Sequence, residues 1–176
     1  MRIKDKEFSL LIDEVVIRQT VSGIAVALQH DLENKNPLFI PVLNGSFMFA
    51  SDLLKEFDAA CELSFVKLAS YEGIHSSMNV KELIGLTNEV KGRPVVILEE
   101  IIDTGATVET MISKLKEKGA DDIRIATLLF KPSVFKKNYF IDYVGKEIQD
   151  EFVVGYGLDY MGYGRNLKEI YKMKND

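Results

Sequence analysis

The amino-acid sequence predicts an α/β fold built on a doubly wound, mostly parallel sheet. Short apolar runs of the kind that form buried strands alternate with segments whose apolar residues recur at helical spacing. Strands that alternate with helices along a chain form parallel sheets covered by helices. A length of 176 residues fits one domain, so we expect residues 1–176 to form a single domain.

The first half of the chain predicts a helix, a strand and a second helix. Asp13 suits an N-cap, and the helix after it has one apolar face. The residues of that face are Ile17, Val21, Ile24, Ala25 and Leu28. A break over 34–37 precedes a predicted strand over 38–43 and a helix over 46–57. The Asn-Gly pair at 44–45 is a common hairpin turn, but the helical spacing after it favours a strand–turn–helix connection.

The second half continues the alternation. After an apolar stretch over 62–68, residues 69–88 are polar and aperiodic, and we expect a mobile loop there. A strand is predicted over 95–98, and a helix is predicted over 108–118 and ends at Gly119. Two further strands are predicted over 123–130 and 152–155.

Composition and charge argue against several classes of protein. The net charge of −5 does not favour broad electrostatic binding to nucleic acid. No apolar run approaches the roughly 20 residues that span a bilayer, and the charged N-terminus lacks the apolar segment of a signal peptide. The single cysteine, Cys61, cannot form an internal disulfide. We expect it to be a small buried hydrophobe in a reducing, cytoplasmic setting.

The most informative segment runs from Val95 to Thr107. An apolar strand is followed by carboxylates at Glu99, Glu100 and Asp103, a turn of small residues and an amphipathic helix. The turn places free backbone N–H groups and the positive end of the helix at one point, which suits a phosphate. The carboxylates suit ribose hydroxyls or a Mg²⁺ ion. The segment therefore predicts an anion, sugar and metal site at the carboxyl edge of the sheet.

Six blocks of sequence resemble one family, in the same order along the chain. They are 41–49, 70–71, 99–107, 131–132, 142–145, and 152–160 with 165–167. In these blocks the chain resembles the type I phosphoribosyltransferases, and within them the hypoxanthine (guanine) phosphoribosyltransferases. The resemblance implies the doubly wound core and a small hood built from the two chain ends. It also implies purine salvage, in which phosphoribosyl diphosphate (PRPP) and hypoxanthine or guanine give IMP or GMP and pyrophosphate.

The resemblance implies a role for each residue of the acidic segment. Asp103 would be the general base that takes the proton of the purine, rather than an aspartate that only opens the turn before the helix. Glu99 and Glu100 would bind the ribose hydroxyls and, with Asp159, hold Mg²⁺, the implied cofactor. The implied cradle of the 5′-phosphate is Thr104, Gly105, Ala106 and Thr107.

The remaining matched residues are implied to hold pyrophosphate and the base. The implied pyrophosphate contacts are Leu43, Asn44, Gly45 and Arg165. The implied purine contacts are Lys131, Phe152, Val153 and Asp159. Among them, Lys131 would donate to the 6-oxo group and so reject adenine, and Phe152 would stack on the ring. Ser70 and Tyr71 match the start of a lid loop that excludes water from the reaction.

Two residues depart from the family pattern. Asn44 is neutral where the family often has lysine, and the family peptide bond before this position can be cis. Glu100 is one methylene longer than the aspartate that many members carry. The charge-based contribution of Asn44 and the role of the second carboxylate therefore stay open.

Two alternative functions also stay open. One is a non-catalytic regulator of the same fold that binds nucleotide and RNA, although Asp103 and the acidic net charge count against it. The other is an enzyme that prefers xanthine, since base preference depends on pocket differences worth about 1–3 kcal/mol. We expect small-molecule substrates, PRPP and a 6-oxopurine, with no nucleic-acid or membrane partner. The family resemblance implies a homodimer or a homotetramer.

Overall fold

The structure, a computed structural model, describes residues 1–69 and 81–174. Within these residues the helices are α1 (Glu14–Leu32), α2 (Phe47–Glu56) and α3 (Ala106–Glu117). The strands of the larger sheet are β3 (Leu38–Leu43), β4 (Glu62–Leu63), β5 (Val66–Ala69), β6 (Lys81–Ile84), β7 (Pro94–Ile102), β8 (Asp122–Phe130) and β9 (Tyr143–Glu147). The strands of the smaller sheet are β1 (Arg2–Ile3), β2 (Lys6–Ile12), β10 (Val153–Val154) and β11 (Ile170–Met173).

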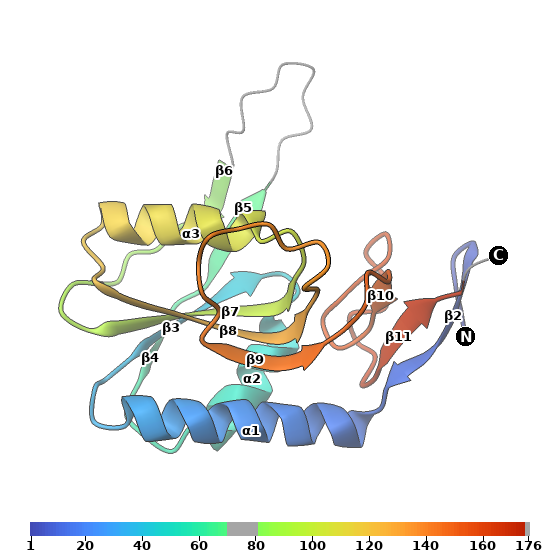
Figure 1. The fold of residues 1–176 in the computed structure, drawn as a ribbon, viewed down its shortest axis with the longest axis horizontal. Helices are drawn as coiled ribbons and strands as arrows, with labels where there is room; N and C mark the ends of the chain where they lie inside the picture. The colour runs from blue at the N-terminus through green and yellow to red at the C-terminus, as the bar shows by residue number, and fades with distance from the viewer. Residues whose placement is uncertain (70–80, 175–176) are drawn as a thin grey trace.

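The larger sheet is mostly parallel and carries helices on both faces, which confirms the predicted fold class. Its strand order is β6-β5-β3-β7-β8-β9, with β4 paired to β3. The pairings of β3 with β7, β7 with β8 and β8 with β9 are all parallel, whereas β6 runs antiparallel to β5. Figure 1 shows α1 and α2 on one face of this sheet and α3 on the other.

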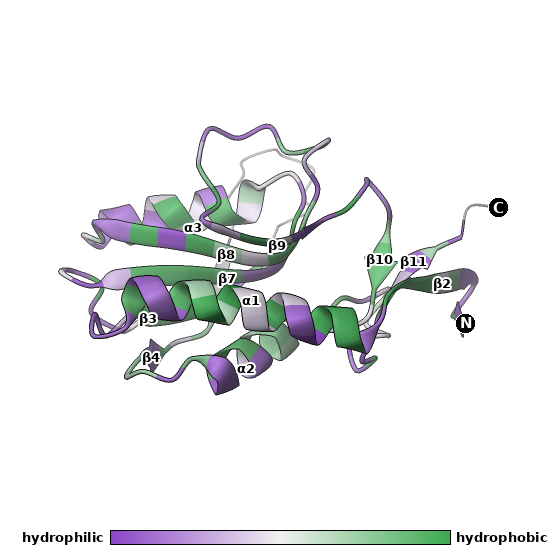
Figure 2. Cartoon of the chain, turned by 60° about the horizontal axis from the view of Figure 1, so that its bottom comes forward, coloured by the Kyte–Doolittle hydropathy of each residue, from purple (hydrophilic) through white to green (hydrophobic). Residues whose placement is uncertain are grey.

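The central strands are apolar on both faces because both faces are covered. Every residue of β7 from Pro94 to Leu98 is buried, and β3 is buried over most of its length. On one side, Phe39 packs in a cluster with residues of α1 and α2, and on the other Ile97 packs in a cluster with residues of α3. The green, hydrophobic colouring of the central strands in Figure 2 follows from this double burial.

The first helix begins where its cap predicts. The Asp13 carboxylate accepts a hydrogen bond from the backbone N–H of Val16 at 2.9 Å, and α1 starts at the next residue, Glu14. The predicted apolar face is buried against the sheet. Among the residues that the structure describes, no helix is both long and apolar enough to cross a membrane.

The smaller sheet joins the two ends of the chain, and we call it the hood. Its strand order is β1-β2-β11-β10, and β11 pairs antiparallel with both neighbours. Ile3, Phe8 and Val154 form a small apolar cluster of its own. Both marked termini lie at this end of the molecule in Figure 1. The hood that the family resemblance implies is therefore present.

The structure also corrects two sequence-based expectations and adds strands that the sequence did not predict. The loop expected over 69–88 contains β6, an edge strand that pairs through its backbone and so needs no apolar pattern. The strand expected over 95–98 continues to Ile102, because its pairing with β8 extends past the two carboxylates. The hood strands and β9 had no predicted bounds, apart from the short segment around β10. Ser70 and Tyr71 lie outside the described residues.

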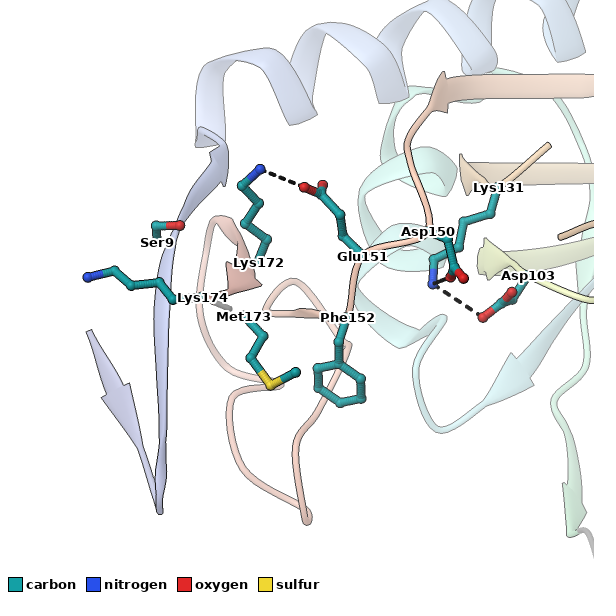
Figure 3. Close-up of a pocket in the computed structure, with 9 residues that line it drawn as sticks. All are labelled: Ser9, Asp103, Lys131, Asp150, Glu151, Phe152, Lys172, Met173 and Lys174. Carbon is teal, nitrogen blue, oxygen red and sulfur yellow. Dashed lines mark hydrogen bonds and ion pairs between the residues drawn. The ribbon is translucent and has the colours of Figure 1, made fainter. Parts of the chain in front are cut away.

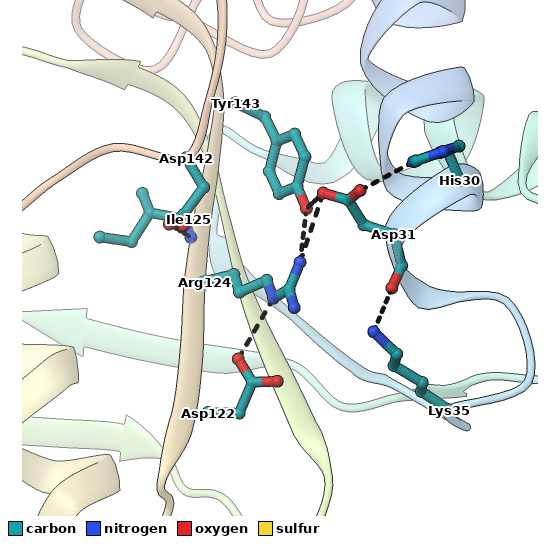
Figure 4. A network of polar contacts seen from close by, with 8 residues as sticks. All are labelled: His30, Asp31, Lys35, Asp122, Arg124, Ile125, Asp142 and Tyr143. Atoms are coloured by element: carbon teal, nitrogen blue, oxygen red, sulfur yellow. Dashed lines mark hydrogen bonds and ion pairs between the residues drawn. The ribbon is translucent and has the colours of Figure 1, made fainter.

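A polar network fastens α1 to the strands β8 and β9 (Figure 4). The Tyr143 hydroxyl donates to Oδ2 of Asp31 on α1 at 2.7 Å and accepts from Nη1 of Arg124 at 2.9 Å. Nε of Arg124 also donates to Asp122 at 3.2 Å. Burial and the hydrogen bond to Asp31 raise the pKa of Tyr143 to about 12, so the phenol stays protonated as the donor of this network.

We expect Tyr143→Phe to lower the free energy of unfolding by about 1–2 kcal/mol, because the ring is kept while both hydrogen bonds are lost. Urea denaturation followed by circular dichroism measures the change. Tyr163→Phe is the matched control, since the Tyr163 residue is 55% exposed and should change stability by less than about 0.5 kcal/mol. Equal effects of the two variants would show that the network does not stabilise the fold.

Candidate active site

Two adjacent carboxyl groups are buried near the carboxyl end of β7. Glu99 is only 7% exposed, and burial together with the negative charge of Glu100 raises its pKa well above the usual range. Burial likewise raises the pKa of Glu100 to about 7, although the positive charge of Arg165 opposes this rise. Oε2 of Glu100 is inaccessible and has no hydrogen-bond partner among the described residues. The pair therefore offers acceptor atoms that the described residues leave partly unsatisfied.

Glycines let the backbone approach Glu100 closely. A Cβ atom at Gly45 would lie 1.6 Å from Oε1 of Glu100, and a Cβ atom at Gly157 would lie 1.9 Å from the carbonyl oxygen of Gly45. Gly157 has a φ of +98°, a left-handed conformation that favours glycine. Any side chain larger than that of glycine would therefore clash at position 45 or 157. The two glycines let the turn after β3 pack against both the end of β7 and the segment after β10.

The turn after β3 is fixed at both ends. The peptide bond between Leu43 and Asn44 is cis, the form that can occur at this position in the family that the sequence resembles. The buried Ser46 hydroxyl donates to the carbonyl oxygen of Val42 at 2.6 Å. The Ser46 hydrogen bond closes the turn beside Glu100, and α2 begins directly after it.

The small-residue turn at 104–107 opens α3. Gly105 has a φ of +82° and is the N-cap of the helix, and Thr104, Ala106 and Thr107 are exposed around it. The Tyr139 hydroxyl donates to the carbonyl oxygen of Gly105 at 2.8 Å, and the Tyr139 ring packs edge-on against Phe135. The aromatic segment supports the turn from behind and leaves the first N–H groups of α3 available for an anion.

A cavity of about 760 Å³ lies between the larger sheet and the hood (Figure 3). Its lining residues are Ser9, Asp103, Lys131, Asp150, Glu151, Phe152, Lys172, Met173 and Lys174. Lys131 is buried, and its ammonium donates to Oδ2 of Asp103 at 3.3 Å and to Oδ1 of Asp150 at 3.1 Å. Phe152 is 44% exposed, with its edge against Tyr160. Phe152 is therefore not a core residue, and part of its side chain is accessible from the cavity.

The segment after β10 brings a cation next to the carboxylates. Arg165 forms an ion pair with Oδ1 of Asp159 at 2.5 Å and donates to the carbonyl oxygen of Gly157 at 2.7 Å. Asp159 also accepts from the backbone N–H of Gly162 at 2.6 Å. The Val153 side chain is buried in the core. Arg165 therefore has ordered partners and differs from a freely solvated surface arginine.

The described residues supply only part of a coordination shell for Mg²⁺. No group of three potential metal-ligating His, Cys, Asp or Glu side chains lies together in the part of the chain that the structure describes. The buried, unpartnered Oε2 of Glu100 is nevertheless the kind of hard oxygen ligand that Mg²⁺ takes. Mg²⁺ commonly uses one or two protein carboxylates and completes its shell with water and substrate phosphate. A Mg²⁺ ion brought by a phosphorylated substrate is consistent with this donor set.

Comparison with known proteins identifies the family. A family model described as "Phosphoribosyl transferase domain" matches residues 15–161. The hypoxanthine-guanine phosphoribosyltransferase of Bacillus subtilis (strain 168) is 39% identical over 166 residues, covering 94% of this chain and 92% of the relative. The protein of the same name from Streptococcus pneumoniae (strain ATCC BAA-255 / R6) is 36% identical over 170 residues, covering 95% and 93%. The chain belongs to the phosphoribosyltransferase family.

Solved structures agree in fold as well as sequence. A crystal structure of a hypoxanthine phosphoribosyltransferase from Staphylococcus aureus superimposes with a TM-score of 0.89 at 35% sequence identity. The match covers 97% of this chain and 92% of the other. The doubly wound core and the hood are therefore shared with this experimentally determined structure.

The structure brings the predicted residues together in two connected groups. Asp103, Lys131 and Phe152 line the cavity, while Glu100, Gly45 and the Arg165 segment gather at the end of β7.

Sequence reasoning missed Asp150 and Tyr139. Asp150 lies two residues before Phe152, and its proximity to a matched block was the available signal. Tyr139 gave no signal, because only the folded chain brings it to Gly105.

The raised pKa of Glu100 predicts a specific pH dependence of stability. A carboxyl group whose folded pKa is about 7, against 4.5 ordinarily, stabilises the fold below pH 4.5, and this contribution is lost as pH rises through 7. Glu100→Gln should therefore increase the free energy of unfolding relative to wild type by more at pH 8 than at pH 5.5, by on the order of 1–2 kcal/mol. Urea titrations of both proteins without substrate or metal measure the difference. If the substitution raised the free energy of unfolding equally at both pH values, Glu100 would ionise normally in the folded protein.

Proposed function

We propose that this chain is a purine-salvage enzyme that transfers the 5-phosphoribosyl group of PRPP to a 6-oxopurine, hypoxanthine and also guanine. One observation carries this proposal most directly. A buried lysine, Lys131, contacts a carboxylate, Asp103, in a cavity that also exposes the ring of Phe152. A 6-oxopurine requires a donor for its oxo group, an acceptor for its ring proton and an aromatic face for stacking, and these residues supply all three.

PRPP would lie along the carboxyl edge of the larger sheet. In this arrangement the N–H groups and hydroxyls of residues 104–107 hold the 5′-phosphate at the start of α3. Glu99 and Glu100 accept from the ribose hydroxyls, which gives the partly unsatisfied pair the donors it lacks. The turn at 43–45 and Arg165 hold the pyrophosphate group, through backbone N–H groups and a guanidinium respectively. Asn44 contributes no charge to that contact.

The chemical step exchanges one bond for another at the anomeric carbon. A purine nitrogen forms a bond to this carbon while the bond from the carbon to the pyrophosphate oxygen breaks, and pyrophosphate leaves with the bonding electron pair. The purine ring loses a proton, which the Asp103 carboxylate accepts. Lys131 donates to the 6-oxo group, Val153 reads the purine edge through its backbone, and Asp159 lies at the far side of the base. Much of the rate enhancement in such a site comes from positioning the two substrates.

Mg²⁺ is part of the proposal. When bound, it would neutralise charge on the departing pyrophosphate. Glu99, Glu100 and Asp159 are the residues proposed to hold it. Asp159 is already paired with Arg165, so substrate and metal would have to compete with this ion pair for its carboxylate.

Several further expectations belong to the same proposal. Residues 1–176 would act as one phosphoribosyltransferase domain, in the cytoplasm, as a homodimer or homotetramer. Lys131 would exclude adenine, which carries an amino group at position 6. Xanthine also has a 6-oxo group, so Lys131 alone does not exclude it. The lid role of Ser70 and Tyr71 stays a prediction from sequence.

A panel of nucleobases tests the proposal. Purified protein is incubated with PRPP, Mg²⁺ and hypoxanthine, guanine, xanthine or adenine, and nucleotide formation is followed by chromatography. We expect IMP and GMP, little or no AMP, and loss of turnover with excess chelator. Nucleotide formed from none of the bases would favour the nucleotide-binding regulator, and xanthine as the best substrate would favour the second alternative.

Asp103→Asn should separate chemistry from PRPP binding. The amide keeps the shape of the side chain but cannot take the proton, so we expect a single-turnover rate lower by about 10²–10⁴-fold. PRPP affinity should change little, because the phosphate turn and the strand-end carboxylates are intact. Asp58→Asn, at an exposed position, is the control and should match wild type. A rate loss below about tenfold, or a collapse of PRPP affinity, would make Asp103 a ligand or a cap instead of the base.

A further inference from the structure

One buried ammonium group is shared between two carboxylates from different segments. Lys131 follows β8, and its side chain is 7% exposed. Asp103 follows β7, and Asp150 lies in the connection between β9 and β10. Figure 3 shows both carboxylates next to the Lys131 ammonium. Their distances from Nζ, 3.3 Å and 3.1 Å, are nearly equal, so neither carboxylate holds the cation alone.

The shared ion pair matters because Asp103, one of the two carboxylates, is also the proposed general base. In the proposed reaction Asp103 accepts a proton and becomes neutral. If Asp103 were the only counter-ion, the buried Lys131 would then lose its partner when the reaction is under way, and a buried charge without a partner is costly. Asp150 takes no proton in that reaction, and its carboxylate remains beside the ammonium throughout.

We propose that Asp150 is a positioning residue that keeps the Lys131 ammonium from pairing fully with Asp103 and holds it toward the cavity. This inference rests on the proposed function. A lysine ammonium has three N–H donors. Among the described residues the Lys131 ammonium donates to these two carboxylates, which leaves its third donor for the 6-oxo group of the purine.

The proposal predicts what happens when Asp150 loses its charge. Without that charge, Lys131 binds Asp103 alone, and proton transfer to Asp103 becomes less favourable because it would break the remaining ion pair. The donor is also drawn away from the purine. The phosphate turn at 104–107 and the turn at 43–45 are untouched. The chemical step and purine binding should therefore suffer, while PRPP binding should not.

Asp150→Asn is the first variant to test, since Asp150 is 59% exposed and an amide of the same shape should not disturb folding. We expect a single-turnover rate roughly tenfold lower, within the range of coupling found for charged groups in contact, with the KM for PRPP changed by less than about twofold. Asp150→Glu, which keeps the charge, should recover part of the rate.

Asp122→Asn is the matched control. Asp122 is a partly exposed aspartate in an ion pair with Arg124 at 3.2 Å, and it lies at the opposite end of β8 from Lys131. Its substitution removes the same charge from the same kind of contact. The rate and both KM values should equal those of wild type.

A double-mutant cycle with Lys131→Met decides between positioning and a merely structural role. If Asp150 acts through Lys131, Asp150→Asn should slow Lys131→Met enzyme by less than about twofold, measured in single turnovers at high enzyme concentration. A tenfold loss in both backgrounds, or no loss in either, would overturn the inference while wild type remains active. An inactive wild-type protein would instead overturn the proposed function, and the inference with it.

Discussion

Two adjacent carboxyl groups buried at the end of β7 are the constraint on which the site depends. Transfer of such groups out of water costs free energy, and the apolar core of the sheet has to offset it. The chain accommodates them by raising the pKa of both groups, by placing Gly45 against Glu100 and by bringing Arg165 near. A ligand that supplies hydroxyls or a cation would satisfy these atoms and so stabilise the folded state, by an amount that grows with the logarithm of the ligand concentration over its Kd.

The site has two halves of different construction. The turn at 104–107 and the two carboxyl groups belong to the larger sheet, where strand pairing and two apolar clusters fix the backbone. The cavity beside Phe152 has the hood as its second wall, which contributes Ser9 and Met173. The hood rests on a much smaller apolar cluster than the larger sheet does. The half of the site proposed to hold the phosphorylated sugar is thereby built on the larger sheet, whereas the shape of the other half depends on the smaller hood.

The sequence predicted what depends on local pattern and missed what depends on tertiary pairing. The cap at Asp13, the strand 38–43 and the helix after the phosphate turn follow from apolar spacing and small residues, and the structure confirms them. The edge strand β6 lies in a segment without clear apolar periodicity, and its backbone pairing leaves no signature in the sequence. The family resemblance selected Asp103 and Lys131, whereas Asp150 lies just outside a matched block, and its contact with Lys131, 19 positions away, is visible only in the folded chain.

The position of β11 between β2 and β10 has a consequence for the folding of the chain. The strands β2 and β11 are neighbours in the hood, yet the whole of the larger sheet lies between them in the sequence. The backbone N–H of Lys174 donates to the carbonyl oxygen of Glu7, 167 positions earlier. The pairing of β7 with β8, on either side of α3, joins residues that are much closer in the sequence. The wall opposite Lys131 therefore depends on pairings of long sequence range, which cost more chain entropy to close than those of the larger sheet.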